Sequence, residues 1–272
     1  MSGVRLLRRA EPPQRVDLSA LRPEALAGLA EGAIARLPLG TARAPLAVGD
    51  LFRVQAGDEA DLVIEGGSPR FDQLGAGMTT GILLIEGDAG CCLGRGMRGG
   101  RITLRGGAGA FAASGLTGGV IEVTGDAGDF LGGAAVGERT GMAGGVVVVR
   151  GGSGARAADR MRRGLMVIEG AAGPQLASHM IAGTVVCARP GPHPGTLMRR
   201  GTLLLGEAAL LPTFVPAGLA ADSAFLRLLA RALRPLSAAA ARLADSAAAR
   251  FVGDMATLGK GEILLAGSIP AG

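Results

Sequence analysis

The sequence predicts a mainly β fold: a single-stranded right-handed parallel β-helix of about seven to eight coils, followed by a C-terminal helical arm. Three observations predict it: a repeat of about 19 residues, glycines at fixed phases of that repeat, and methionines at another phase. The 272 residues include 48 glycines, yet 48% of the chain is hydrophobic, which excludes a disordered linker. Collagen is excluded because glycine does not occupy every third position.

Short apolar segments, each entered from a glycine, recur along the middle of the chain. Their starts are separated by 19, 19, 26, 19, 19 and 18 residues, and residues 61–66 form another such segment upstream. The sequence contains no asparagine, which argues against a leucine-rich repeat, and glycine at this density destabilises helical repeats. The segments begin at Ile82, Arg101, Val120, Val146, Leu165, Thr184 and Thr202.

Glycine closes five consecutive segments and recurs three residues later, so each corner needs a positive φ or has too little room for a Cβ. The two columns are Gly87, Gly106, Gly125, Gly151 and Gly170, then Gly90, Gly109, Gly128, Gly154 and Gly173. Four residues before each segment stands an apolar residue, which we expect to form an inward-facing structural ladder. This ladder comprises Met78, Met97, Leu116, Met142, Met161, Met180 and Met198.

Within each segment the second and fourth residues are apolar and should face the interior. Many first and third residues are also apolar, which predicts a sheet buried on both faces. Either the termini of the chain or another subunit should therefore cover the outer face. The outward apolar residues are Ile82, Leu84, Val120, Val146, Val148, Leu165, Val167, Val186 and Leu204.

Three regions are expected: an N-terminal cap (1–60), the glycine-rich β-helix (61–206), and a C-terminal helical arm and tail (207–272). The cap should hold a strand near residues 4–7 and a short helix over 23–30.

In the arm, Asp222 or Ser223 should N-cap a helix over 225–234. Phe225, Leu228, Leu229 and Ala232 are expected on one face of this helix. A second, alanine-rich helix is expected over 237–251, and the tail from Gly253 to Ile263 should return to a turn and a final strand.

The sequence predicts no catalytic residue and no metal site. His179 and His193 lack a local partner at metal-ligand spacing, and the three cysteines (Cys91, Cys92 and Cys187) form no C-x-x-C motif. The net charge of +5 fits acidic partner subunits, and no aromatic residues interleave with the basic ones as in nucleic-acid binding. Without a signal peptide or a membrane-spanning apolar stretch, a cytoplasmic protein is expected.

One constellation carries a binding hypothesis. Arg98, Arg162 and Arg199 each follow a ladder methionine, with Arg163 and Arg200 adjacent, so stacking would align them along one edge. A row of guanidinium groups suits a chain of carboxylates, by charge-assisted pairing. A solvated edge, or ion pairs between subunits, is the alternative.

The run Gly75-Ala-Gly-Met-Thr-Thr-Gly81 and the repeated turns resemble the glutamate synthase C-terminal β-helix family. Within it, the segment 48–54, the stretch 125–145 of the 26-residue turn and the tail 253–262 look like the C-type subunit of formylmethanofuran dehydrogenase. This subunit type also occurs in the related formyltransferase/hydrolase complex. The resemblance spans residues 45–265.

The resemblance implies a non-catalytic structural subunit in a hetero-oligomer with an amidohydrolase-like subunit, a formyltransferase subunit and a third subunit. That complex moves a formyl group from tetrahydromethanopterin to a methanofuran-type carrier and releases formate. This chain alone would bind no cofactor, but its arginine edge could guide the carrier's glutamyl tail.

Three alternatives remain open at this point. The chain could be the dehydrogenase subunit itself, a detached glutamate synthase domain, or a free-standing module that binds an acidic polymer. The basic residues are almost all arginine, since Lys260 is the only lysine, and this composition favours the formyltransferase/hydrolase complex over the dehydrogenase.

Overall fold

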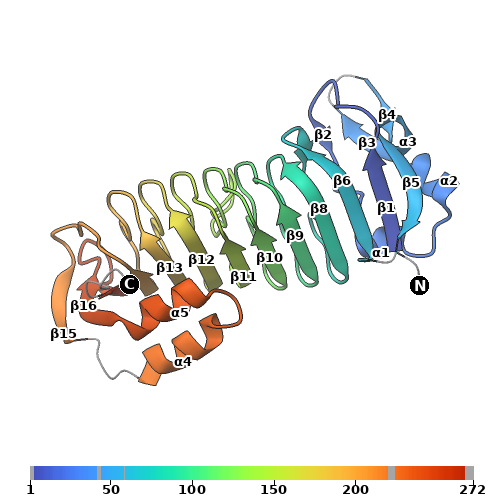
Figure 1. Ribbon diagram of the computed structural model, residues 1–272. Coiled ribbons are helices and arrows are strands. Elements are labelled where there is room, and N and C mark those ends of the chain that lie inside the picture. Colours follow the sequence, from blue (N-terminus) through green and yellow to red (C-terminus); the bar gives the residue numbers. More distant parts are fainter. Residues whose placement is uncertain (1–2, 42–43, 58, 220–223, 267–272) are drawn as a thin grey trace.

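The computed structural model describes residues 3–41, 44–57, 59–219 and 224–266, and it shows an elongated molecule built on one long sheet (Figure 1). The described residues form 13 strands in this sheet, and the N- and C-terminal regions lie at opposite ends of it. From one edge to the other the strands are β15 (Val215–Leu219), β16 (Ala247–Gly253), β17 (Lys260–Ala266), β14 (Arg200–Leu205), β13 (Thr184–Arg189), β12 (Arg163–Ala171), β11 (Ala143–Val149), β10 (Val120–Val123), β9 (Arg101–Arg105), β8 (Ile82–Ala89), β6 (Leu62–Ser68), β1 (Gly3–Arg8) and β5 (Phe52–Gly57).

The central strands pair in parallel, each with the next along the chain, so the protein is mainly β with a large parallel sheet. Ile82 lies opposite Arg101, Arg101 opposite Val120, and Val120 opposite Val146. The longer spacing between β10 and β11 therefore leaves the register intact. A second line of parallel bridges joins Ala89, Ala108, Ala127, Ser153 and Ala172 away from the main strands. The chain thus returns to the same position once per repeat.

The six ladder methionines and Leu116 are fully buried, and most touch the next turn in the same way. The methyl group of Met142 occupies the space where a Cβ of Gly164 would stand, only 2.5 Å away. Gly164 also has a φ of +106°, which side chains rarely adopt. The same contact pairs Met78 with Gly100, Met97 with Gly119, Met161 with Gly183, Met180 with Gly201 and Met198 with Gly261.

The glycine columns that follow the strands arise from a different constraint. Gly106 and Gly170 have ordinary φ values, but a Cβ there would lie less than 3.0 Å from the carbonyl groups of Gly87 and Gly151, respectively. Close backbone approach between turns, rather than backbone conformation, excludes a side chain at these two positions.

Non-glycine residues with a left-handed backbone occur at another corner, which follows the second line of bridges. Phe111, Phe130 and Arg156 all have positive φ values, of 60°, 57° and 58°. Their amides donate hydrogen bonds to the following turn, to Asp129, Ala155 and Pro174. These bonds satisfy the backbone and offset a conformational cost of about 1–2 kcal/mol per residue.

The N-terminal region extends and covers one end of the sheet. Strand β1 pairs in parallel with β6 and antiparallel with β5, so the predicted strand at residues 4–7 is present. The helix predicted over 23–30 is shorter: α1 ends at Leu26, before Gly28 adopts a φ of +78°. Helices α1 (Pro23–Leu26), α2 (Glu31–Ala35) and α3 (Val48–Leu51) lie beside a small sheet of β4 (Leu46–Ala47), β3 (Pro38–Thr41), β2 (Val16–Asp17) and β7 (Phe71–Asp72).

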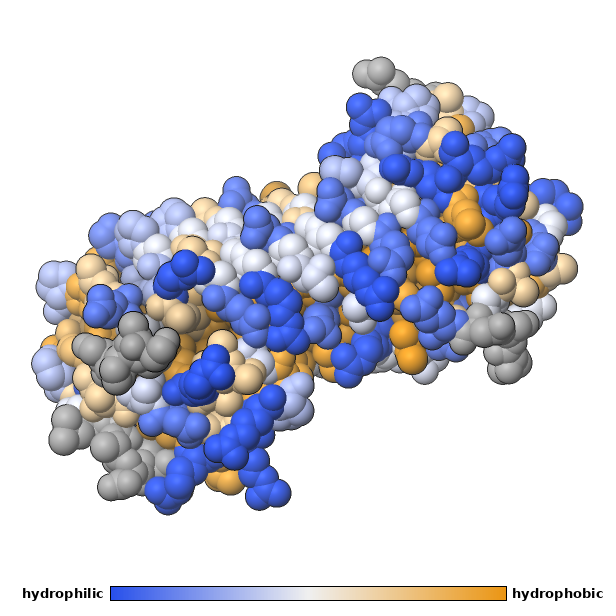
Figure 2. All heavy atoms as spheres, in the orientation of Figure 1, coloured by the Kyte–Doolittle hydropathy of each residue, from blue (hydrophilic) through white to orange (hydrophobic). Residues whose placement is uncertain are grey.

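Two C-terminal helices, α4 (Ala224–Leu233) and α5 (Ala238–Asp245), cover the outer face of the sheet around β11–β14 (Figure 1). They form a second apolar cluster with the outward residues Val148, Val167, Val186 and Leu204. On the face shown in Figure 2, hydrophilic residues stand among apolar ones at this end of the molecule. The chain itself therefore covers this half of the outer face, whereas Ile82 on β8 stays 45% exposed.

The structure of the arm differs from the prediction in the buried face of its first helix and in the length of its second. The predicted N-caps, Asp222 and Ser223, lie outside the described residues. The buried face of α4 carries Leu226, Leu229, Ala230 and Leu233. The predicted face is therefore right for Leu229 and wrong for Phe225, Leu228 and Ala232, which are exposed. The helix predicted over 237–251 ends at Asp245, because residues from Ala247 pair as β16 with β17.

The tail adds a strand that continues the stack. β17 pairs in parallel with β14, with Thr202 opposite Glu262 and Leu204 opposite Leu264. The antiparallel strands β16 and β15 follow it to the edge. The long sheet therefore ends in an antiparallel strand at each edge, β5 and β15.

Replacing Gly164 with alanine should destabilise the protein by about 2–4 kcal/mol, because Gly164→Ala combines left-handed strain with clashes against the Met142 methyl group and the Gly145 carbonyl oxygen, 2.5 and 2.8 Å from the added Cβ. Gly96→Ala is the matched control: its φ is +63° but nothing lies within 4 Å of the added Cβ, so about 1 kcal/mol is expected. Urea unfolding followed by circular dichroism measures both, since the chain has no tryptophan or tyrosine. Equal losses would contradict the methionine–glycine constraint.

Truncation of Leu233 on the buried face of α4 should cost about 2–5 kcal/mol, because Leu233→Ala leaves a cavity in the second apolar cluster. Leu228 on the same helix is 66% exposed, so Leu228→Ala should change stability by no more than about 0.5 kcal/mol. The same unfolding assay compares the two. If Leu228→Ala lowered stability more than Leu233→Ala, α4 would pack through the face predicted from the sequence.

Candidate interaction edge

The predicted arginine edge follows one line of backbone hydrogen bonds. The residue after each ladder position donates its amide to the ladder carbonyl one turn earlier, as Arg98 does to Met78 and Arg162 to Met142. This column runs through Arg98, Thr117, Ala143, Arg162, Ile181 and Arg199. The structure therefore places Arg98, Arg162 and Arg199 on one edge, separated by turns that carry no charge there.

All five arginines predicted for this edge are exposed: Arg98, Arg162, Arg163, Arg199 and Arg200. None of the ion pairs among the described residues involves them. A rise of about 4.8 Å per turn spaces Arg98 and Arg162 by roughly 14 Å, and Arg162 and Arg199 by roughly 10 Å. Arg200 lies opposite Lys260, which concentrates positive charge at the far end.

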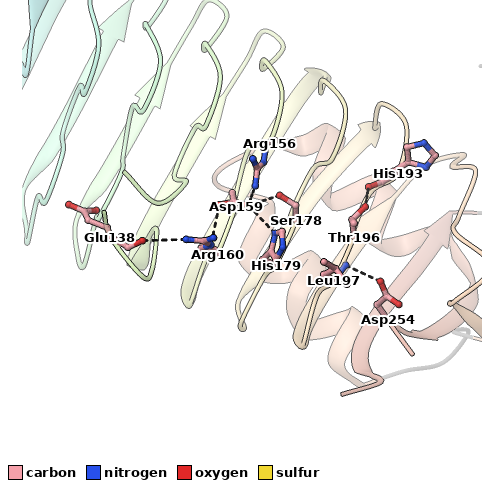
Figure 3. A network of polar contacts seen from close by, with 10 residues as sticks. All are labelled: Glu138, Arg156, Asp159, Arg160, Ser178, His179, His193, Thr196, Leu197 and Asp254. Carbon is pink, nitrogen blue, oxygen red and sulfur yellow. Dashed lines mark hydrogen bonds and ion pairs between the residues drawn. The ribbon is translucent and has the colours of Figure 1, made fainter. Parts of the chain in front are cut away.

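Beside this edge lies a polar network that the sequence did not predict, centred on Asp159 (Figure 3). The Asp159 side chain is only 4% exposed and accepts a 2.6 Å hydrogen bond from Ser178 Oγ. It pairs with Arg156 at 3.0 Å, and His179 Nδ1 lies 3.5 Å away. Ser178 and His179 both contact the carboxylate, but no hydrogen bond is found between them in the described chain. This arrangement joins two neighbouring turns.

A second part of the network holds the 26-residue turn. Glu138 forms an ion pair with Arg95, two turns earlier in the stack, at 2.8 Å. On the other side Arg160 donates to the Glu138 carbonyl at 3.5 Å and lies 3.8 Å from Asp159. The additional residues of this turn are therefore held from both directions, and Figure 3 shows the contact with Arg160.

Asp254 closes the last turn of the stack. It is 1% exposed and accepts hydrogen bonds from the amides of Leu197 and Ala256, each at 2.9 Å. Burial opposes its ionisation, but the Thr213 side chain and these two amides lower the pKa of the carboxyl. Asp254 therefore acts as an ionised anchor between the tail and the stack.

The two histidines lie in turns of the stack, and Cys187 lies in its core. His179 Nδ1 lies 3.5 Å from a carboxylate oxygen of Asp159, which belongs to the preceding turn and is not a neighbour in sequence. His193 lies in a turn where its carbonyl accepts from Thr196. Cys187 is buried, and burial raises its pKa and that of Cys92.

A cavity of about 650 Å³ lies at the N-terminal end, outside this edge. Its lining includes three carboxylates, and each accepts a hydrogen bond from a backbone amide. Glu24 accepts from Thr79, Glu31 from Ala56, and Asp61 from Ile82. Glu24 thereby links the N-terminal region to the stack, Glu31 holds α2 against β5, and Asp61 joins two neighbouring turns. No cluster of possible metal ligands occurs among the described residues, and none of their helices is long and apolar enough to span a membrane.

Fold and edge together define a mainly β protein of stacked, glycine-rich parallel strands with a row of exposed arginines. No protein-family model matches the sequence. The chain is 49% identical over 267 residues to the C-type subunit of the formyltransferase/hydrolase complex Fhc of Methylorubrum extorquens, covering 97% of this chain and 99% of the relative. The chain therefore belongs to the family of C-type subunits of the formyltransferase/hydrolase complex.

A solved structure gives the same assignment. The crystal structure of the formyltransferase/hydrolase complex FhcABCD from Methylorubrum extorquens, in complex with methylofuran, contains a chain that matches with a TM-score of 0.88. The two chains are 45% identical, and the match covers 97% of this chain and 99% of the other. The resemblance inferred from the sequence is confirmed, and the comparison favours the hydrolase-type complex.

Replacing Asp254 with asparagine should lower stability at neutral pH by about 1–3 kcal/mol, since Asp254→Asn loses charge-assisted hydrogen bonds. Its folded-state pKa is lowered, so the ionised group stabilises the fold above the unfolded pKa, and this is lost as pH falls. As pH falls below about 5, the stability of the variant should therefore decline less steeply than that of the wild type. Asp245→Asn, half exposed on α5, is the control. Parallel acid profiles for wild type and Asp254→Asn would contradict this assignment.

Proposed function

We propose that this chain is a non-catalytic structural subunit of a formyltransferase/hydrolase complex. That complex converts formyl-tetrahydromethanopterin to formate through a formylmethanofuran-type carrier. The observation that carries the proposal is the similarity to the C-type subunit of the Fhc complex over nearly the full length of both chains. The chemistry would belong to an amidohydrolase-like subunit and a formyltransferase subunit, and a third subunit would complete the assembly.

The roles of the buried polar groups support a structural rather than a catalytic part. Asp159 joins adjacent turns, Asp254 fixes the tail, and Asp61 accepts the Ile82 amide of the next turn. Each of these carboxylates is engaged by donors of the fold itself. A catalytic group in contrast needs free capacity towards a substrate.

We also propose that residues 61–206 form a right-handed parallel β-helix, with an N-terminal cap at 1–60 and a C-terminal arm at 207–272. In-register pairing of turns and the second line of bridges support it. Such a body is long, holds its surface residues at regular intervals, and suits the positioning of partner subunits.

The arginine edge would guide the carrier, as the glutamyl tail expected of a methanofuran-type carrier provides several carboxylates. The roughly 10–14 Å spacings between Arg98, Arg162 and Arg199 correspond to about three to four residues of extended chain. These guanidinium groups are accessible, because they are exposed and form no ion pair with the described residues. The related structure that contains methylofuran supports this choice of ligand.

Assembly is tested by co-expressing the tagged chain with the other three subunits of the complex and identifying the purified components by mass spectrometry. The proposal expects a stable hetero-oligomer with formyltransferase and hydrolase activity. Partners of an FMN-dependent glutamate synthase, or metal and iron–sulfur subunits of a formylmethanofuran dehydrogenase, captured from the native cell would reject it.

Removing the three column arginines together should weaken binding of the polyglutamyl carrier by roughly ten-fold or more, at about 0.5–1 kcal/mol for each exposed pair. The triple variant carries Arg98→Ala, Arg162→Ala and Arg199→Ala, and carrier affinity is measured on the assembled complex at two salt concentrations. The loss should shrink at high salt.

A control triple variant removes the same charge elsewhere, at the exposed residues Arg36, Arg53 and Arg101. Its carrier affinity should remain that of the wild type. Unchanged affinity in the column variant, or equal losses in both, would remove the edge from carrier binding.

A further inference from the structure

The 26-residue turn projects a loop, residues 134–140, that differs from every other turn of the repeat. Val136 in this loop is 95% exposed, which exceeds the exposure of every other large apolar residue in the described chain. The next most exposed is Leu228 at 66%. A solvated valine contributes nothing to folding, because its apolar surface stays in water.

The loop is held in place on both sides. The Ala134 amide donates to the Asp159 carbonyl at 3.2 Å, and the Gly141 amide to the Arg160 carbonyl at 3.0 Å. Between them Glu138 pairs with Arg95 at 2.8 Å. Binding by such a loop pays little ordering entropy, so contacts at Val136 would translate efficiently into affinity.

Phe130, at the start of the same turn, contacts an aromatic ring of the preceding turn and an arginine of the following one. Phe130 stacks on Phe111 with ring centroids 4.9 Å apart and planes 8° from parallel. Arg156 lies over the other side of Phe130, at 5.0 Å from the ring centroid. Both rings are half-buried, and aromatic and arginine residues are the types that dominate the energetics of protein interfaces.

Charge around the loop is unbalanced. The ion pairs of the described residues join three arginines, Arg95, Arg156 and Arg160, to two carboxylates, Glu138 and Asp159. Arg139 is exposed and takes part in no ion pair of the described residues. A complementary surface would therefore carry acidic groups, whereas a second copy of this edge would repel it.

We propose that loop 134–140 is a docking knob for another subunit of the complex, which receives Val136 in an apolar socket rimmed by carboxylates. The proposal rests on the proposed function for the presence of that partner. A polyglutamyl chain satisfies the arginines but offers no apolar socket, so a protein partner accounts for both features.

The test compares assembly of the full chain with its co-expressed subunits, measured as subunit stoichiometry by native mass spectrometry and as affinity by titration. Val136→Asp should weaken association with one subunit by roughly ten-fold or more. It should leave the unfolding midpoint of the chain unchanged, because Val136 is solvated. Arg139→Glu should weaken the same association, in a salt-dependent manner.

Leu228→Asp introduces the same charge at an exposed apolar residue on α4 and should assemble like the wild type. Wild-type assembly by Val136→Asp, or equal losses in Val136→Asp and Leu228→Asp, would overturn the docking knob while the proposed function stands. Failure of the wild-type chain to assemble with these subunits would overturn both.

Discussion

The structure depends on the contact between a methionine of one turn and a glycine of the next. Met142 fills the space beside Gly164, and the same contact recurs at most turns of the stack. The glycine needs both its left-handed backbone and its missing side chain, so a shift of one residue would place a Cβ against the methyl group. This packing keeps the register constant, and constant register aligns the exposed arginines.

Much of the fold could be predicted because the same residue types recur at the same positions of a repeat of about 19 residues. The strand positions, the buried ladder and the covered outer face all follow from residues about nineteen apart. The arm could not be predicted as well, since it does not repeat. Residues 247–253 are rich in alanine and favour a helix locally, but pairing with β17 overrides that preference. Similarly, the exposed Phe225 shows that α4 packs by its position on the sheet rather than by its largest side chain.

The arginine edge was predictable from the same phase, whereas the network beside it was not. Asp159 gains its partners from Ser178 and His179 in the next turn, and Glu138 reaches back to Arg95. Such pairs follow from stacking and from the path of an irregular loop, which no local motif encodes. One signal was present: an aspartate at the position where other turns carry Ser114 and Ser178.

The antiparallel strands at the two edges of the long sheet limit how far this architecture can grow. A stack of identical turns offers the same hydrogen-bonding edge at each end and could polymerise end to end into fibres. Here β5 has its Ala56 amide bonded to Glu31, and β15 carries Pro216, which lacks an amide hydrogen. The body is thereby restricted to a finite rod whose flanks, rather than its tips, remain open to other polypeptides.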